Sequence, residues 1–184
     1  MASNTETYQG KSATSHHEHS KREGYHDNYQ ASRVRLAELR DSPALVTLFS
    51  QAYPDTAENE ETMQYWLEQG GALLLEDSSG QAISAVRWLE TAHGWQLDRV
   101  ATLPSQHGKG FGRWLLTRVE ALAIQRNVAS LQLPLHIEDE AWLGYYERMG
   151  YHRSDHPLQG DEGDEAMVLR KQVGGVWQLK DTHL

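Results

Sequence analysis

The chain has 184 residues, of which 39% are apolar and 23% are charged, as expected of one folded domain with a sizeable core. It contains no cysteine, so a disulfide framework, a cysteine-based zinc site and a thiol nucleophile are all excluded. The net charge of −9 argues against broad binding to nucleic acid or anionic lipid, and no apolar run approaches the roughly 18 residues that span a bilayer. We expect a cytoplasmic protein without nucleic-acid or membrane partners.

The first 30 residues are predicted to form a disordered polar arm, because they hold almost no aliphatic side chains that could offset the entropy of ordering. His16, His17 and His19 could ligate a metal, but no carboxylate or cysteine spacing fixes a geometry there, so we favour a polar tail and expect no metal site. The folded domain is predicted over residues 31–174, followed by a tail over residues 175–184.

The first elements are predicted from apolar periodicity. Alternation predicts a strand over residues 33–37. The following helix has Ser42 as its expected N-cap and Pro43 at its first helical position, and one face carries Leu45, Leu48, Phe49 and Ala52. A second helix, over residues 59–69, ends at two glycines. Three consecutive strands with short turns follow as a meander, over residues 72–77, 81–90 and 95–103.

The second half adds two helices and three strands. A helix starting at Phe111 has Leu115, Val119 and Leu122 on the same face, and a strand follows over residues 130–135, where Pro134 indicates a bulge or an unpaired edge position. Asp139 is the expected cap of the next helix and Gly150 its end, before two strands at residues 151–154 and 165–173. This order predicts an α+β domain whose mixed sheet is covered by helices.

A glycine-rich stretch, "PSQHGKGFGRWLL", leads into the helix at Phe111. A helix N-terminus offers unpaired backbone N–H groups and the positive end of the helix dipole, which together favour phosphate. Gly108, Gly110 and Gly112 lack the Cβ atoms that would hold an anion away. The stretch therefore predicts a phosphate-binding loop.

Two common phosphate-binding motifs do not fit. A Walker A loop would need glycine where Thr5 precedes the Gly10–Ser12 segment, which lies in the polar arm. A dinucleotide fingerprint would need its third glycine where Arg113 stands, and the preceding strand is expected to be the fourth of a largely antiparallel run rather than the start of a parallel βαβ unit. A nucleoside triphosphatase and a dinucleotide enzyme are therefore disfavoured.

The stretch resembles the signature of the GCN5-related N-acetyltransferase (GNAT) superfamily, Arg or Gln, two residues, Gly, one residue, Gly or Ala, in which backbone amides hold the pyrophosphate of acetyl-CoA. Its positions are His107 to Gly112, and His107 replaces the usual Arg or Gln. A second landmark of that superfamily matches "YERMGY", Tyr146 to Tyr151, with Asp139 in place of the usual Asn. The resemblance covers about residues 33–172.

The resemblance implies a three-layer α/β/α fold of the acyl-CoA N-acyltransferase type, with a mixed, mostly antiparallel sheet and helices on both faces. It also implies direct transfer of an acetyl group from acetyl-CoA to a primary amine, with Tyr146 as general acid toward the departing thiolate. The implied coenzyme-binding residues are Val100, Ala101, Thr102, His107, Gly108, Lys109, Gly110, Phe111, Gly112, Arg113, Asp139 and Tyr146.

The general base is left open among several groups. Asp98 shares a strand face with Gln96 and Val100 and is the candidate carried forward, while Glu90 and His93 lie at the adjacent turn. A water chain could serve instead.

The acceptor is expected to be an amine of a small molecule or peptide, and a homodimer is left open. An acidic turn at Asp161, Glu162, Asp164 and Glu165 could attract a cationic acceptor, although a solvated turn is the commoner explanation. Four tryptophans could line an acceptor pocket, with core packing as the default: Trp66, Trp88, Trp95 and Trp142.

Two observations bear on the choice of function. Members of the resembled superfamily that acetylate ribosomal-protein N-termini carry a Glu at the position of Pro134, which speaks against that subclass. Since His107 and Asp139 depart from the usual residues, a non-catalytic acyl-CoA-binding or sensor domain is the alternative. A protein-interaction module built around the arm is a further one.

Overall fold

A computed structural model describes residues 32–135, 142–154 and 167–174. The predicted arm at residues 1–30, Asp139, the acidic turn and the tail at residues 175–184 lie outside the described residues.

The order of elements predicted from the sequence is confirmed, apart from two added turns of 3₁₀ helix. The helices are α2 (Ser42–Ala52), α3 (Glu60–Gln69), α4 (Phe111–Gln125) and α5 (Leu143–Arg148), and the short turns are η1 (Leu39–Asp41) and η2 (Pro104–Gln106). The strands are β1 (Arg33–Leu36), β2 (Gly70–Glu76), β3 (Ala82–Thr91), β4 (Gly94–Thr102), β5 (Ser130–Leu135), β6 (His152–Arg153) and β7 (Met167–Gln172).

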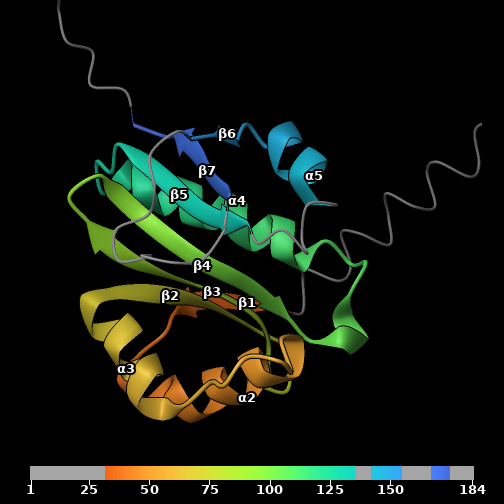
Figure 1. Cartoon of the computed structure of the whole chain (residues 1–184). Coiled ribbons are helices and arrows are strands. Elements are labelled where there is room, and N and C mark those ends of the chain that lie inside the picture. Colours follow the sequence, from red (N-terminus) through yellow and green to blue (C-terminus); the bar gives the residue numbers. More distant parts are fainter. Residues whose placement is uncertain (1–31, 136–141, 155–166, 175–184) are drawn as a thin grey trace, which may run out of the picture.

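The seven strands form one mixed sheet in the order β1-β2-β3-β4-β5-β7-β6. The predicted meander is confirmed, because β2, β3 and β4 pair antiparallel in sequence order. Figure 1 shows α2 and α3 on one side of the sheet and α4 and α5 on the other, which is the expected three-layer α/β/α arrangement. One expectation about topology is wrong: β4 pairs parallel with β5, so β4–α4–β5 is a βαβ unit. The edge of an antiparallel run can also start a parallel crossover, and the local pattern does not reveal this.

The core forms where the apolar faces of the helices meet the sheet. Leu45, Leu48 and Phe49 of α2 are at most 2% exposed, as their spacing predicts, and α4 buries Phe111, Leu115 and Val119. Leu122 is only partly buried. At roughly 1.5–3 kcal/mol for each large side chain fully buried, these two faces fix both helices against the sheet.

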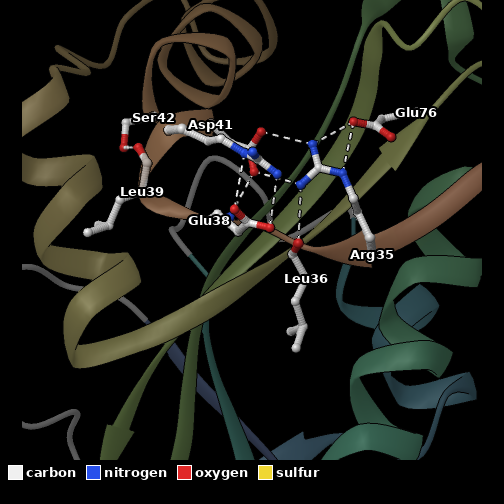
Figure 2. A network of polar contacts seen from close by, with 8 residues as sticks. Arg35, Leu36, Glu38, Leu39, Asp41, Ser42 and Glu76 are labelled. Atoms are coloured by element: carbon white, nitrogen blue, oxygen red, sulfur yellow. Dashed lines mark hydrogen bonds and ion pairs between the residues drawn. The ribbon is translucent and has the colours of Figure 1, made fainter.

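The start of α2 differs from the prediction by one residue, because Asp41 is the N-cap and Ser42 is already helical. Arg35 of β1 explains the shift, since its guanidinium donates to both Asp41 carboxylate oxygens at 2.6 and 2.8 Å and to Glu76 Oε1 of β2 at 2.6 Å (Figure 2). The Ser42 hydroxyl donates to the Leu39 carbonyl at 2.7 Å. The hydrogen bonds from Arg35 lower the pKa of Asp41 below its ordinary value.

Strands β4 and β5 separate toward their carboxyl ends, as Figure 1 shows. Their described pairing consists of Trp95 opposite Leu131 and Gln96 opposite Gln132. Further along β5, Pro134 lies opposite Val168 of β7, whose carbonyl accepts from the backbone of Ser154 and therefore faces β6. Pro134 consequently turns its backbone toward β4, where the ladder has already ended. The proline therefore marks neither a bulge nor an edge position: its register with β7 is continuous, and β5 is an interior strand whose described ladder with β4 ends before Pro134.

Candidate active site

The glycine-rich segment at residues 107–112, called the glycine loop, leads into α4, and no side chain caps the N-terminus of this helix. Gly110 is the N-cap residue, with φ of 80°, and Gly108 has φ of 75°, a region that residues with a Cβ avoid. No acidic residue lies in the first turn of α4, and the helix begins with the bond from Trp114 N to Gly110 O at 3.0 Å. Because the first amides of a helix lack intrahelical partners, this terminus is suited to an anion.

Basic side chains surround this terminus. His107 and Arg113 are exposed, and Lys109 donates to the Gln106 side chain at 2.8 Å. The loop is held in place by Phe111, which is 3% exposed in the core. In a chain with 26 Asp and Glu and 17 Lys and Arg residues, the charges of Lys109 and Arg113 add to the preference of the helix end for negative charge.

The loop lies against the carboxyl end of β4. A Cβ added to Gly112 would stand 3.3 Å from Val100 Cγ1 and 3.7 Å from Thr102 Oγ1, so the first turn of α4 packs closely on this part of the strand. By contrast, a Cβ on Gly108 would meet nothing within 4 Å. Close packing on one side and open space on the other form a cradle at the end of the strand.

The opening between β4 and β5 is lined by backbone groups of β4. The Leu103 N–H donates to the Ile83 carbonyl of β3 at 3.0 Å, and in an antiparallel ladder successive residues face alternate sides. Val100 and Thr102 therefore face β5, whereas Ala101 faces β3. Of the three residues predicted to hold the coenzyme chain, two point their backbone groups into the opening.

Both carbonyls on this edge accept hydrogen bonds from side chains. The Tyr53 hydroxyl donates to Val100 O at 2.9 Å, and His107 Nε2 lies 2.9 Å from Thr102 O. A carbonyl oxygen only accepts, so Nε2 of His107 carries the proton. His107 thus ties the glycine loop to the end of β4.

A β-bulge interrupts the ladder between β3 and β4 next to this edge. Val86 pairs with Val100 and Trp88 with Leu97, so Arg87 alone lies opposite both Asp98 and Arg99. Bulges of this kind re-aim side chains and are frequent beside active sites.

A buried ion cluster sits at the bulge. Arg87 is 5% exposed, and its guanidinium donates to Asp98 Oδ2 at 2.8 Å and to Glu58 Oε2 at 2.7 Å while lying over the rings of Phe49 and Trp66. Burial disfavours its charge, but the carboxylates of Asp98 and Glu58 outweigh that effect and raise the pKa of Arg87 above its ordinary value.

Arg99 adds a second link between the bulge and the α2–α3 connection. Its guanidinium donates to Thr56 Oγ1 at 2.5 Å and lies 5.0 Å from the centre of the Tyr53 ring. Together with Glu58, these contacts hold residues 53–59 over the carboxyl half of β4. Sequence reasoning missed Tyr53, Glu58 and Arg87, since partners so far apart in the chain leave no local signal.

The three candidates for the general base lie in different places. Asp98 is at the bulge, where Oδ2 accepts from Arg87 and Oδ1 lies 3.8 Å from Arg99 Nε. Glu90 and His93 lie at the other end of β4, next to the β3–β4 turn, with 54% of the Glu90 side chain exposed. At about 3.3 Å per residue, the strand carries that turn some 25 Å from Thr102. The structure brings only Asp98 toward the glycine loop.

Tyr146 lies on α5 within a chain of aromatic rings. Its ring is 5.2 Å from that of Tyr145 and 6.0 Å from that of Tyr151, both edge to face, and Tyr145 in turn contacts Trp142. Backbone bonds from Met149 and Tyr151 to the Tyr146 carbonyl close the helix, which ends just before Gly150 as predicted. Tyr146 is half-buried, in contact with the core.

An ion pair anchors the end of α5 to the rest of the fold. Lys171 of β7 lies 2.7 Å from Glu120 of α4 and donates to the Met149 carbonyl at 2.6 Å. Tyr151 is fully buried beside this pair, and burial, followed by the charge of Glu120, raises the pKa of Tyr151 well above its ordinary value. This phenol therefore stays protonated around neutral pH.

The four tryptophans divide between core and surface. Trp88 and Trp95 stack at 4.7 Å and are at most 3% exposed, so they belong to the core. Trp66 is half-buried under Arg87, whereas Trp142 is 56% exposed at the start of α5. Only Trp142 offers an open aromatic surface.

The part of the chain that the structure describes contains neither a membrane-spanning helix nor a cluster of metal-ligating side chains. None of its helices has the length and apolar character needed to span a membrane. Its His, Asp and Glu side chains form no group of three that could hold a metal ion.

The chain matches a model of a known protein family and the folds of several solved structures. The family model described as "Acetyltransferase (GNAT) family" matches residues 36–151, which include the glycine loop and Tyr146.

Solved structures share the fold at low sequence identity. The ribosomal-protein-S18-alanine N-acetyltransferase from Escherichia coli has a TM-score of 0.69 at 19% identity, over 80% of this chain and 97% of that one. The PaiA N-acetyltransferase from Thermoplasma acidophilum, in complex with coenzyme A, has a TM-score of 0.59 at 15% identity, over 77% and 98%. A variant of the SpeG spermidine N-acetyltransferase from Vibrio cholerae has a TM-score of 0.62 at 17% identity, over 78% and 95%.

Proposed function

Since the chain belongs to the acetyltransferase (GNAT) family, we propose that it is an acetyl-CoA-dependent N-acetyltransferase that acts on a primary amine. The observation that carries this proposal is the N-terminus of α4, which begins at Gly110 without a side-chain cap and opens beside the diverging strands β4 and β5. An anion-binding helix end next to an open strand edge suits a ligand with a diphosphate at one end and amide groups along its length.

The residues present fit coenzyme A. The amides that follow Gly108 and Gly110, with Lys109 and Arg113 nearby, would bind the diphosphate. The N–H groups of Val100 and Thr102 face the opening and would bind the amide-containing arm as an added strand does. Bound acetyl-CoA would supply the acetyl thioester for transfer. Ala101 and Asp139 stay predictions for this role.

Tyr146 is proposed as the general acid. A phenol with an ordinary pKa near 10 can donate a proton to the thiolate that leaves when the amine nitrogen bonds to the acetyl carbon. The contacts of its ring with Tyr145 and Tyr151 would orient the hydroxyl.

Asp98 stays a prediction for the general base. To take the amine proton, its carboxylate would have to loosen its contacts with Arg87 and Arg99. The same contacts suit Asp98 to position the bulge through Arg87, and a chain of water molecules is the alternative acceptor of the amine proton.

The acceptor is proposed to be the amine of a small molecule or peptide. The Vibrio cholerae neighbour acts on spermidine, and the Escherichia coli neighbour acts on an alanine of a ribosomal protein. Pro134 stands in β5, at the position where the sequence resemblance expects a glutamate in enzymes that modify ribosomal proteins. A polyamine or other small amine is therefore the better starting point for a search.

The proposal is tested by thiol release from acetyl-CoA against a panel of amines, amino acids, polyamines and basic peptides. With an accepted amine, Tyr146→Phe should lower kcat at least tenfold with little change in the Kd of acetyl-CoA, because the hydroxyl meets the leaving group only during transfer. Tyr145→Phe is the matched control, since it removes a hydroxyl from the residue that precedes Tyr146 in α5. Equal rates for the two variants would remove Tyr146 from catalysis.

A non-catalytic acyl-CoA sensor is the second candidate. It is favoured because His107 stands where the family usually has Arg or Gln, and because its side chain contacts the carbonyl of Thr102. Calorimetry separates the two functions. A sensor would bind acetyl-CoA and release no thiol with any amine, whereas the enzyme would do both.

A further inference from the structure

A cavity lies at the edge of the sheet formed by β6 and β7. Its volume is about 380 Å³, and the described residues that line it are Gly150, His152, Arg153, Ser154, Arg170 and Gln172. None of these six residues is acidic, and three carry basic side chains, although the chain as a whole has a net charge of −9.

The register of the strands places two of these basic side chains side by side. His152 of β6 lies directly opposite Arg170 of β7, and such cross-strand partners share one face of the sheet. The neighbouring Lys171 points to the other face, where it pairs with Glu120 of α4. Arg170 and His152 are therefore on the face away from α4.

Arg170 has a buried nitrogen that needs an acceptor. Its Nε atom is inaccessible to solvent and forms no hydrogen bond within the described residues. By contrast, Arg35 and Arg87 each contact two carboxylates. Arg99, about as exposed as Arg35, lies 3.8 Å from Asp98 and donates to Thr56 Oγ1. Because buried donors are almost always satisfied, an unpaired guanidinium N–H beside a cavity is best explained by a missing acceptor.

We propose that this cavity binds an anionic group, a carboxylate or a phosphate, through Arg170 with His152 as the second donor. A guanidinium presents its N–H groups as a planar fork that matches either anion, and the imidazole offers at least one N–H in every protonation state. The volume falls in the range of small-molecule sites.

The anion has two sources that share this chemistry. Arg170 lies two residues along β7 from Val168, which is opposite Pro134 at the opening between β4 and β5. Two residues along the strand and one spacing between strands separate Arg170 from Pro134, about 8 Å, so an acidic group carried by the acceptor molecule could reach Arg170. A separate small anion could also occupy the cavity on its own.

The test is a titration of the full chain with inorganic phosphate and with acetate at constant ionic strength. Calorimetry measures the affinity, and the melting temperature measures the stabilisation by the bound anion. Arg170→Gln should weaken the affinity for the anion roughly tenfold or more, since a charged hydrogen bond is lost. Arg126→Gln is the matched control, because this substitution makes the same change of charge at the C-terminal end of α4. No saturable binding by the wild type, or equal binding by both variants, would overturn the proposal.

Two additions keep the result interpretable. If Arg170→Gln does not fold, His152→Ala removes the second donor at an exposed position and should still weaken anion binding several-fold; unchanged binding would contradict the proposed pair of donors. For the source, KM is compared for two acceptors that differ only in a carboxylate. An Arg170→Gln effect confined to the acidic acceptor assigns the site to the acceptor, and no effect on either, with phosphate binding lost, assigns it to a separate anion.

The binding readout needs no turnover, so this inference and the proposed acetyltransferase function can fail separately.

Discussion

The imidazole of His107 and the carbonyl of Thr102 are 2.9 Å apart, with the proton on Nε2. This contact joins the glycine loop to the last residue of β4, the two parts that frame the proposed coenzyme site. At the family position usually held by Arg or Gln, this chain thus uses a side chain to hold its own backbone.

His107→Ala should weaken acetyl-CoA binding about fivefold, because the loop loses one hydrogen bond worth about 1 kcal/mol. His107→Gln keeps a side-chain donor and should restore most of the affinity. Calorimetry with acetyl-CoA measures both. If the alanine variant binds as tightly as the wild type, the contact with Thr102 does not order the loop.

Gly108→Ala should weaken acetyl-CoA binding at least tenfold, because the added methyl enters the open space where the diphosphate would lie. Gly80 is a matched control, since both glycines have positive φ, 75° and 83°, and a Cβ on either would meet nothing within 4 Å. Each alanine should cost about 1 kcal/mol of stability for the strained backbone. Calorimetry and urea unfolding measure the two effects, and equal affinities for the two variants would place the coenzyme elsewhere.

Arg87→Met should lower the free energy of unfolding by about 3–5 kcal/mol, because it leaves the buried Glu58 and Asp98 carboxylates without their partner. Adding Glu58→Gln should recover part of the loss, since one of the two unpaired charges is removed. Urea unfolding of the single and double variants measures this. A double variant less stable than the Arg87→Met single variant would show that burial of charge is not the main cost.

Asp41→Asn should make stability less sensitive to acid. Hydrogen bonds from Arg35 lower the pKa of Asp41 in the folded state, so its contribution is fully present above the unfolded pKa of about 3.9 and is lost as the pH falls further. The wild type should therefore lose more stability than the variant between pH 5 and pH 3. Urea unfolding at both pH values checks this, with Asp55→Asn, at an exposed aspartate, as control. Parallel losses in wild type and Asp41→Asn would contradict the linkage.

The order of helices and strands could be predicted because each element has its own apolar period. Phe111, Leu115 and Val119 mark the buried face of α4, and all three are buried. The parallel pairing of β4 with β5 and the bulge at Asp98 could not be predicted, since both depend on which strands meet in space. The shifted cap at Asp41 likewise depends on Arg35, six residues away in another element.

The candidate site was predictable where it rests on backbone conformation. Gly108 and Gly110 do adopt positive φ, and the loop does start α4. The contacts of Tyr53 with Val100 and of Arg87 with Glu58 were missed, because charges and hydroxyls carry no periodic signal for their partners. Tyr146 was found through the family spacing alone.

Pro134 gives the opening between β4 and β5 a permanence that an ordinary strand would lack. Two neighbouring strands with incomplete pairing tend to form a hydrogen-bonded ladder with each other or with a strand of another molecule. Pro134 offers no N–H, so the ladder between β4 and β5 cannot be completed at this residue whether or not a ligand is bound. The gap therefore follows from the chemical structure of proline, and the two strands need not separate before a ligand binds between them.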